Sequence, residues 1–206
     1  NTQLDTLHEM LKFGKDNIAS ESEQEDLRTI DLNRVEFLSP VTWPSNVVCQ
    51  GANYSTHREE SGLTANKPPY NLIFNKAVSS LTGANSDIVK PENVEFLDYE
   101  IEVGLVLGTE ITESTVVNEE DLSKYIAGIV IVNDVSARDV QILEGQWYKG
   151  KSYRTFGPTG PYIYLLDGNE YNLIEDLEIQ LWVNDELRQS ANTNQLLFKP
   201  AETLTE

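Results

Sequence analysis

The sequence predicts an α+β domain that is mostly β. From residue 35 onward, short apolar runs alternate with Pro, Gly and Asn, as strands joined by turns do. The chain shows neither an internal repeat nor the regular strand–helix alternation of a parallel sheet. Its 206 residues, 39% of them hydrophobic, are enough to bury a core. We therefore expect a main domain over residues 35–206, preceded by a small N-terminal region over residues 1–34.

The N-terminal region is predicted to hold a helix and an acidic connection. Leu4, Leu7 and Leu11 recur at helical spacing within residues 4–14. Residues 15–34 are polar and rich in acidic side chains, which is typical of a solvated linker. A short amphipathic helix followed by this linker is the expected arrangement.

The main domain contains several patterns that predict strands. They occur at residues 46–50, 99–107, 127–132 and 177–183. Residues 72–75 form a further short apolar run, which Lys76 closes. Asn184 and Asp185 have the turn chemistry of a tight hairpin leading into residues 186–189. Asn118 is the predicted cap of a short helix that places Leu122 on its inner face. Strands therefore dominate the expected fold.

Composition excludes several classes of protein. The formal net charge of −19 argues against nucleic-acid binding, which needs basic patches. No apolar run approaches the ~20 residues that span a bilayer, and no secretory signal opens the chain. The single cysteine, Cys49, cannot form an internal disulfide and is predicted to be a small buried hydrophobe. We expect a soluble, cytoplasmic protein.

Three carboxylates form a candidate metal site. Glu100 and Glu102 lie two apart in an alternating run, so both project from one strand face, about 6–7 Å apart. Asp134 directly follows a strongly apolar run. Acidic oxygens converging from two strands suit a hard cation such as Mg²⁺ or Mn²⁺. The alternative that spacing leaves open is an acidic outer face on a solvated sheet.

A histidine and three cations complete the candidate chemistry. His57 precedes Glu60 by three residues, so in a helix the carboxylate can hold the imidazole as a general base. The alternative is a surface histidine beside solvated acids. Lys76, Arg138 and Lys151 are candidates to meet an anionic substrate, or else are ion-pair partners of the carboxylates. Residues 58–71 form either a mobile lid or an ordinary surface loop.

Taken together, these motifs resemble the fumarylacetoacetate hydrolase family. The resemblance extends over roughly residues 36–200 and is carried by ordered blocks. The blocks are Gly51-Ala52-Asn53-Tyr54 with His57 and Glu60, Phe74-Asn75-Lys76 with Ser79-Ser80-Leu81, Asp98-Tyr99-Glu100-Ile101-Glu102, Asn133-Asp134-Val135-Ser136-Ala137-Arg138-Asp139-Val140-Gln141, Gly150-Lys151-Ser152 and Gly157-Pro158-Thr159-Gly160-Pro161.

The resemblance implies a mixed β-sandwich roll, a homodimer and a small anionic 2-oxo or β-diketo acid as substrate. It implies Mg²⁺ or Mn²⁺, with Ca²⁺ as a substitute, held by Glu100, Glu102 and Asp134. The leading hypothesis is hydrolysis of a C–C bond in an acylpyruvate or fumarylacetoacetate, with water activated by His57 and Glu60. Metal polarisation and fixed donors would then act where negative charge develops.

The other matching positions carry further implied roles. Lys151 is implied as a catalytic group that stabilises the oxyanion. The implied substrate-binding residues are Tyr54, Lys76, Arg138 and Gln141. Alternative activities on the same chelate are isomerisation of a 2-hydroxydienoate diacid and decarboxylation of a 2-oxo acid such as oxaloacetate. A non-catalytic binding protein that keeps the fold is a third hypothesis.

Two departures from the family pattern stand out. Some relatives place a metal-binding Asp seven residues before the histidine; here that position is Gln50, so a water is expected to complete the shell. Family members also continue past the position of Glu206 into a Gly-Asp and Gly-Thr-Pro-Gly segment. The expectation is that this domain lacks that C-terminal segment.

Overall fold

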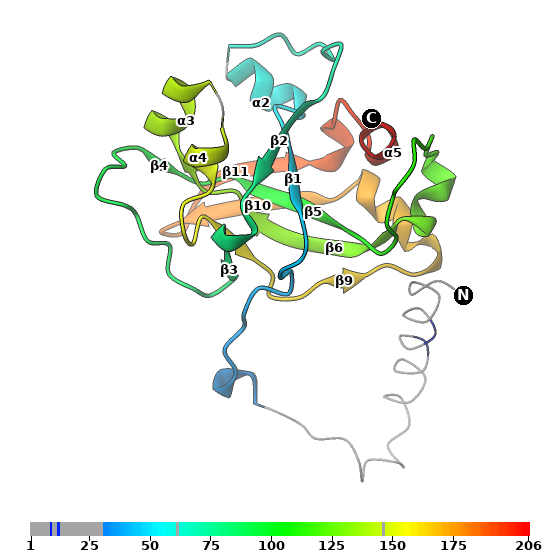
Figure 1. The fold of residues 1–206 in the computed structure, drawn as a ribbon, viewed down its shortest axis with the longest axis horizontal. Coiled ribbons are helices and arrows are strands. Elements are labelled where there is room, and N and C mark those ends of the chain that lie inside the picture. Colours follow the sequence, from blue (N-terminus) through cyan, green and yellow to red (C-terminus); the bar gives the residue numbers. More distant parts are fainter. Residues whose placement is uncertain (1–8, 10–11, 13–30, 61, 146) are drawn as a thin grey trace.

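The structure is a computed structural model that describes residues 9, 12, 31–60, 62–145 and 147–206. Apart from residues 9 and 12, the predicted helix over residues 4–14 lies outside the described residues, as does most of the predicted acidic linker. The continuous described part starts at residue 31 and its first element is a short 3-10 helix, η2 (Leu32–Arg34), whose residues are all exposed. Figure 1 shows this segment lying away from the body of the domain.

A five-stranded sheet forms the centre of the domain. Its strands are β3 (Leu81–Gly83), β5 (Ile101–Leu107), β6 (Ile126–Asn133), β8 (Gly157–Thr159) and β9 (Tyr164–Leu165). The order is β3-β8-β6-β5, with β9 also paired to β6. β5 and β6 run antiparallel and β3 and β8 run parallel, so the sheet is mixed.

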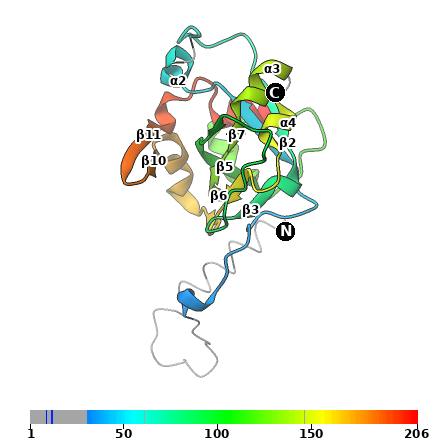
Figure 2. The same ribbon diagram turned by 90° about the vertical axis from the view of Figure 1, so that its left-hand side faces the viewer.

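Three antiparallel pairs surround this sheet. They are β1 (Val47–Gly51) with β2 (Leu72–Lys76), β4 (Leu97–Asp98) with β7 (Ser136–Ala137), and β10 (Glu178–Val183) with β11 (Glu186–Asn192). Asn184 and Asp185 both have positive φ, at 50° and 65°, as a two-residue hairpin turn requires. The predicted hairpin is therefore confirmed. Figure 2 shows β10–β11 and β2 on opposite sides of β5.

The helices are short. The α-helices are α2 (Ser55–Glu60), α3 (Arg138–Glu144), α4 (Tyr148–Lys151) and α5 (Pro200–Thr205). The remaining 3-10 helices are η3 (Val78–Ser80), η4 (Glu119–Lys124), η5 (Gly168–Glu175) and η6 (Thr193–Gln195). Strand exceeds helix in the described residues, which confirms the predicted α+β, mostly β class. Over the same residues, no helix is long and apolar enough to cross a membrane.

The predicted helix after Asn118 exists, but its capping differs from the prediction. The element is a 3-10 helix, η4, and the Asn118 side chain does not cap it. The Asn118 amide instead donates to the Asp121 carboxylate at 3.3 Å, which takes the side chain away from the backbone N–H groups. Leu122 is buried as predicted, in a core cluster shared by η4, β6, η5 and α5. That cluster comprises Val117, Leu122, Ile126, Leu166, Tyr171, Ile174 and Ala201.

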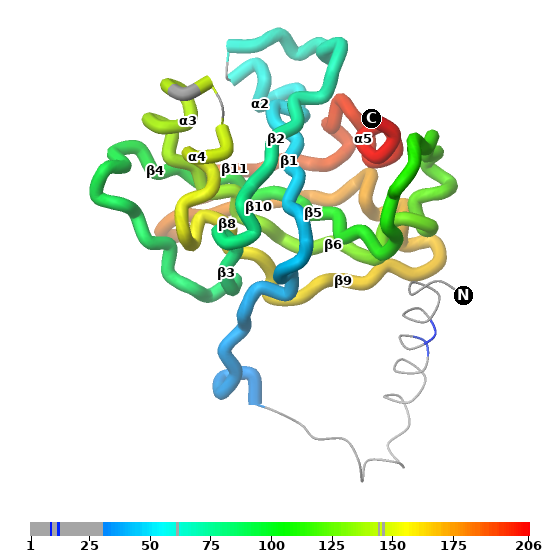
Figure 3. The backbone as a smooth tube through the Cα atoms, viewed as in Figure 1, coloured from blue at the N-terminus to red at the C-terminus, as the bar shows by residue number. Residues whose placement is uncertain are grey.

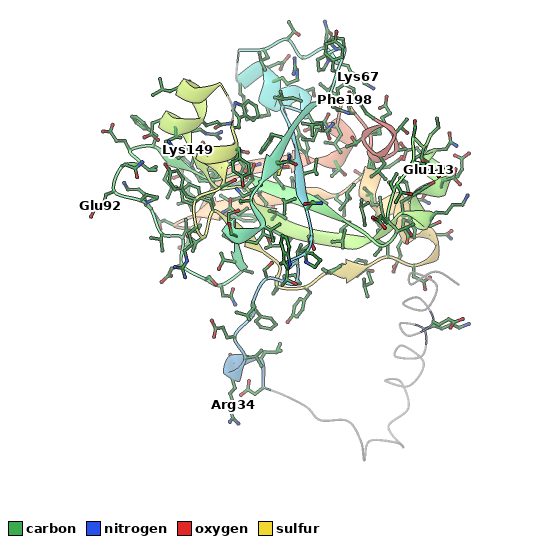
Figure 4. All side chains as sticks on the ribbon, viewed as in Figure 1. Arg34, Lys67, Glu92, Glu113, Lys149 and Phe198 are labelled. Carbon is green, nitrogen blue, oxygen red and sulfur yellow. The ribbon has the colours of Figure 1, made fainter. Side chains whose placement is uncertain are left out.

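The segment proposed as a lid is tied to the end of the chain. Figure 3 shows the described part of the connection between α2 and β2 arching over the domain near α5. The Lys67 ammonium lies 2.5 Å from the Glu202 carboxylate and 4.5 Å from the centre of the Phe198 ring, beside which Figure 4 labels it. Asn71 donates to Glu206 at 2.5 Å. These contacts join Lys67 and Asn71 to α5 and its C-cap residue Glu206.

Candidate active site

Backbone pairing brings Glu100 and Asp134 together. Glu100 lies between β4 and β5, and Asp134 directly follows β6. Ile101 pairs with Asn133 in the antiparallel ladder, so the residues just beyond that pair face each other. The Asp134 N–H donates to the Glu100 carbonyl at 2.8 Å, and the Asn133 side chain accepts from the Glu100 N–H at 3.1 Å. The two carboxylates are therefore positioned by the sheet.

Lys151 lies between these carboxylates. It ends α4, its side chain is only 2% exposed, and its ammonium donates to Glu100 Oε2 and Asp134 Oδ2, each at 2.7 Å. Burial alone would lower the pKa of Lys151, but Asp134 and Glu100 outweigh it and hold the pKa above its ordinary value. The preceding residue is Gly150, where an added Cβ would lie 2.8 Å from the Gln141 backbone nitrogen. Close contact between α3 and α4 therefore places Lys151.

Lys76 reaches Asp134 from the other side. Its ammonium donates to Asp134 Oδ1 at 2.6 Å, to the Val135 carbonyl at 3.4 Å and to the Lys151 carbonyl. Burial lowers the pKa of Lys76 despite the opposing charge of Asp134. An ammonium has three donors, and protein oxygens accept all three here. Lys76 therefore links Asp134 to the last residue of α4. A substrate could contact the Lys76 ammonium only if one of these three hydrogen bonds were broken.

Glu102 is the unpaired member of the carboxylate set. Among the residues that the structure describes, no hydrogen bond or ion pair reaches its side chain. Burial raises the pKa of Glu102 to about 8, and the charges of Glu100 and Asp134 add to the rise. Tyr54 lies close enough for Glu102 to raise the pKa of the phenol, after a larger rise from burial. The charge of Lys151 opposes this rise only in part, so Glu102 is a carboxylate without a direct ion pair in the described structure.

Arg138 and Gln141 form the opposite wall, at the start of α3. Arg138 donates through Nε to Asp98 Oδ2 at 2.8 Å and through NH1 to Gln141 Oε1 at 2.9 Å. The same NH1 lies 2.6 Å from Glu100 Oε1, which also accepts from the Ser136 hydroxyl at 3.2 Å. Gln141 is buried. The family resemblance implied Arg138 and Gln141 as site residues, and the structure adds Asp98, which accepts from Arg138, and Ser136, which donates to Glu100.

His57 and Glu60 do not form the predicted pair. Both lie on α2, so the helical spacing is as expected, but both are exposed. No hydrogen bond joins the two side chains within the described structure. The prediction of an imidazole held by Glu60 is therefore not met in this conformation.

Gln50 has a role that the sequence did not indicate. Its side-chain oxygen accepts from Asn53 at 2.8 Å and from Thr203 at 3.3 Å, and its amide donates to Asn71. Gln50 therefore joins β1 to α5 and to the start of β2. Cys49, beside it, is partly buried, and burial raises the pKa of its thiol to about 12. The prediction of a small buried hydrophobe is met in part, because the thiol is neutral but the residue is only partly buried.

The donor set fits a hard dication in its chemistry. Glu100, Glu102 and Asp134 supply carboxylate oxygens, the ligands that Mg²⁺ and Mn²⁺ prefer, and Glu102 has no cation of its own. Among the described side chains, however, no group of three or more His, Cys, Asp or Glu residues is arranged so that it could hold a metal ion. The Lys151 ammonium between Glu100 and Asp134 explains this. An ion bound by both carboxylates would have to displace it.

The fold is β-rich, and its candidate site interleaves carboxylates with two lysines and an arginine. The family described as fumarylacetoacetate (FAA) hydrolase, C-terminal, matches residues 46–206. The chain belongs to the fumarylacetoacetate hydrolase family.

Named relatives include enzymes that act on small acids. The chain is 37% identical over 181 residues to the mitochondrial oxaloacetate tautomerase Fahd2a of Rattus norvegicus, an alignment that covers 86% of this chain and 55% of the relative. The chain thus spans little more than half the length of the curated relatives that it matches.

Solved structures of the family share the fold. The 5-carboxymethyl-2-hydroxymuconate delta-isomerase of Mycobacterium smegmatis has a TM-score of 0.72 and 32% identity, covering 87% of this chain and 67% of that one. A fumarylacetoacetate hydrolase of Exiguobacterium antarcticum has a TM-score of 0.68 and 31% identity, covering 86% and 64%. These likenesses confirm the predicted family and fold.

Proposed function

We propose that the protein is a metal-dependent enzyme that moves a proton between carbon and oxygen in a small 2-oxo acid, as in keto–enol tautomerisation of oxaloacetate. The observation that carries this proposal is the buried cluster in which Lys151 bridges Glu100 and Asp134 while Arg138 holds Glu100 from the other side. The names of the tautomerase and isomerase relatives support the same reaction class.

The residues of the candidate site have different expected roles in this reaction. The pKa of Lys151 is held above its ordinary value, so Lys151 stays an ammonium and is suited to donate a hydrogen bond to the substrate oxygen where negative charge develops. The Arg138 guanidinium and the Gln141 amide are suited to orient a carboxylate. Mg²⁺ or Mn²⁺, held by Glu100, Glu102 and Asp134, would supply further positive charge at that oxygen. His57 is our candidate for the base that takes the proton from carbon.

Hydrolysis of a C–C bond is the second candidate. It is favoured by His57 and Glu60 lying on one helix and by the hydrolase among the similar structures. Hydrolysis needs an activated water, and the two side chains would have to come together to hold the imidazole as base. Tautomerisation does not need an activated water or a His57–Glu60 contact, so it is our first candidate.

A parallel assay tests both candidates. Full-length protein with Mg²⁺ or Mn²⁺ should accelerate conversion between the keto and enol forms of oxaloacetate, followed by the ultraviolet absorbance of the enol, and a chelator should abolish it. Lys151→Met should lower the rate by about 10²-fold or more, because the donor is lost. Lys149→Met, on the exposed side of the same helix, is the matched control and should retain the rate.

The same samples distinguish the alternatives. Cleavage of acetylpyruvate or fumarylpyruvate without oxaloacetate tautomerisation would reverse the order of the two candidates. Release of CO₂ from oxaloacetate would instead indicate a decarboxylase. Absence of all three activities, in protein that is folded by circular dichroism, would favour a non-catalytic binding protein.

A further inference from the structure

Asp98 lies beside the proposed active site without being one of its ligands. We propose that Asp98 is a positioning residue: it fixes the Arg138 guanidinium so that Arg138 orients the Glu100 carboxylate while Glu100 keeps its negative charge. The inference rests on the metal-dependent function proposed above, in which Glu100 keeps its negative charge for a cation. It adds a residue whose effect on the site passes through Arg138.

The backbone places Asp98 next to Arg138. In the β4–β7 ladder Asp98 is paired with Ser136, and the Arg138 N–H donates to the Phe96 carbonyl at 2.8 Å. Asp98 Oδ1 accepts from the Tyr99 N–H at 3.0 Å, which orients the carboxylate and leaves Oδ2 toward the guanidinium. The position of Asp98 is therefore set by the strand pair and by its own backbone.

Each nitrogen of the Arg138 guanidinium is directed to particular acceptors, which lie on Asp98, Glu100 and Gln141. Nε and NH2 of Arg138 each lie 2.8 Å from Asp98 Oδ2, while NH1 is directed to Glu100 Oε1 at 2.6 Å and to Gln141 Oε1 at 2.9 Å. A guanidinium is planar, so fixing two of its nitrogens fixes the direction of the third. Asp98 thus determines where NH1 lies relative to Glu100.

The negative charge of Asp98 explains why its position beside Arg138 matters for metal binding by Glu100. With Asp98 present, the positive charge of Arg138 is divided between two carboxylates. Without the charge of Asp98, more of the positive charge of Arg138 would act on Glu100, which Lys151 already contacts, and a metal ion would compete for Glu100 less well. A partly exposed ion pair contributes little to stability by itself. The expected effect of removing Asp98 is therefore on cation binding and not on folding.

Isothermal titration of Mn²⁺ into the metal-free, full-length protein tests the inference. Asp98→Asn should weaken Mn²⁺ binding by about tenfold, the usual effect of losing a group that orients a ligand. Arg138→Gln combined with Asp98→Asn should bind Mn²⁺ as Arg138→Gln alone does, because Asp98 acts through Arg138. If Asp98 had only a structural role, Asp98→Asn would weaken Mn²⁺ binding in the Arg138→Gln background as well.

The matched control removes one carboxylate charge elsewhere. Glu92 is exposed, lies in the loop before β4 and stands at the edge of the molecule in Figure 4. Glu92→Gln should leave Mn²⁺ affinity unchanged. Circular dichroism checks the fold of each variant, and Asp98→Ser replaces Asp98→Asn if the latter does not fold.

Each contrary result has a distinct meaning. If the wild type does not bind Mn²⁺, the metal-dependent function fails and this inference fails with it. If the wild type binds but Asp98→Asn matches Glu92→Gln, the inference alone is overturned. A defect of Asp98→Asn that persists in the Arg138→Gln background also overturns it, because Asp98 would then act without Arg138.

Discussion

At the scale of single residues, Glu102 is a carboxyl group whose ionisation the fold opposes. Its pKa is raised to about 8 from an ordinary value of 4.5. A carboxyl with a raised folded pKa binds its proton more tightly in the folded state than in the unfolded chain. Its contribution to stability is therefore fully present below about pH 4.5 and is lost as the pH rises through about 8.

We predict that metal-free protein in chelator becomes less stable between pH 5 and pH 8, on the order of a few kcal/mol. Glu102→Gln should flatten this fall, measured by urea unfolding at a series of pH values, and Mn²⁺ should offset it in the wild type. Glu113→Gln, an exposed residue far from the site, is the control and should keep the wild-type profile. An unchanged profile in Glu102→Gln would contradict the prediction.

The sequence predicted the carboxylates of the site better than their surroundings. Glu100 and Asp134 could be predicted from strand periodicity and from the end of an apolar run, which depend on local sequence alone. The bridging position of Lys151 depends on a contact between α3 and α4, and the burial of Lys76 depends on the pairing of β1 with β2. Such contacts join residues far apart in the chain, and spacing does not encode them.

At the scale of elements, the β10–β11 hairpin is attached to the central sheet by a side chain. The Gln189 side chain accepts from the Ile101 N–H at 2.8 Å and donates to the Ile101 carbonyl at 3.1 Å. It thus satisfies both backbone groups of the first residue of β5, as a neighbouring strand would. The hairpin itself was predictable from alternation and turn residues, whereas this attachment was not.

Gln189→Ala should destabilise the protein by about 1–3 kcal/mol, because the Ile101 backbone groups lose their partner. Urea unfolding followed by tryptophan fluorescence measures the change. Gln180→Ala is the matched control: Gln180 lies on the partner strand and bonds only to the exposed Glu178 in the described structure, so its loss should be nearly neutral. Equal effects of the two substitutions would show that Gln189 does not anchor the hairpin.

At the scale of the whole molecule, charge is the dominant feature. The chain has 34 acidic and 15 basic Lys and Arg residues, a net charge of −19. Like charges oppose the compact state, and salt screens them over a distance that shortens as ionic strength rises. The net charge therefore lowers stability at low salt.

We predict that the unfolding temperature rises by a few degrees when NaCl is raised from about 10 mM to about 200 mM, measured by calorimetry. A variant with three exposed carboxylates neutralised, Glu92→Gln, Glu110→Gln and Glu113→Gln, should show a smaller rise. A fall with added salt would mean that the buried ion pairs, and not the net charge, govern the response to ionic strength.

The contact between Gly150 and Gln141 limits how this site can change during evolution. Because α3 and α4 meet there without an intervening side chain, this close contact sets the spacing between Arg138 and Gln141 on one helix and Lys151 on the other. A larger residue at position 150 would shift all three donors relative to the sheet that bears Glu100 and Asp134. New substrate preferences are therefore more accessible through the loops around the site than through the spacing of these two helices.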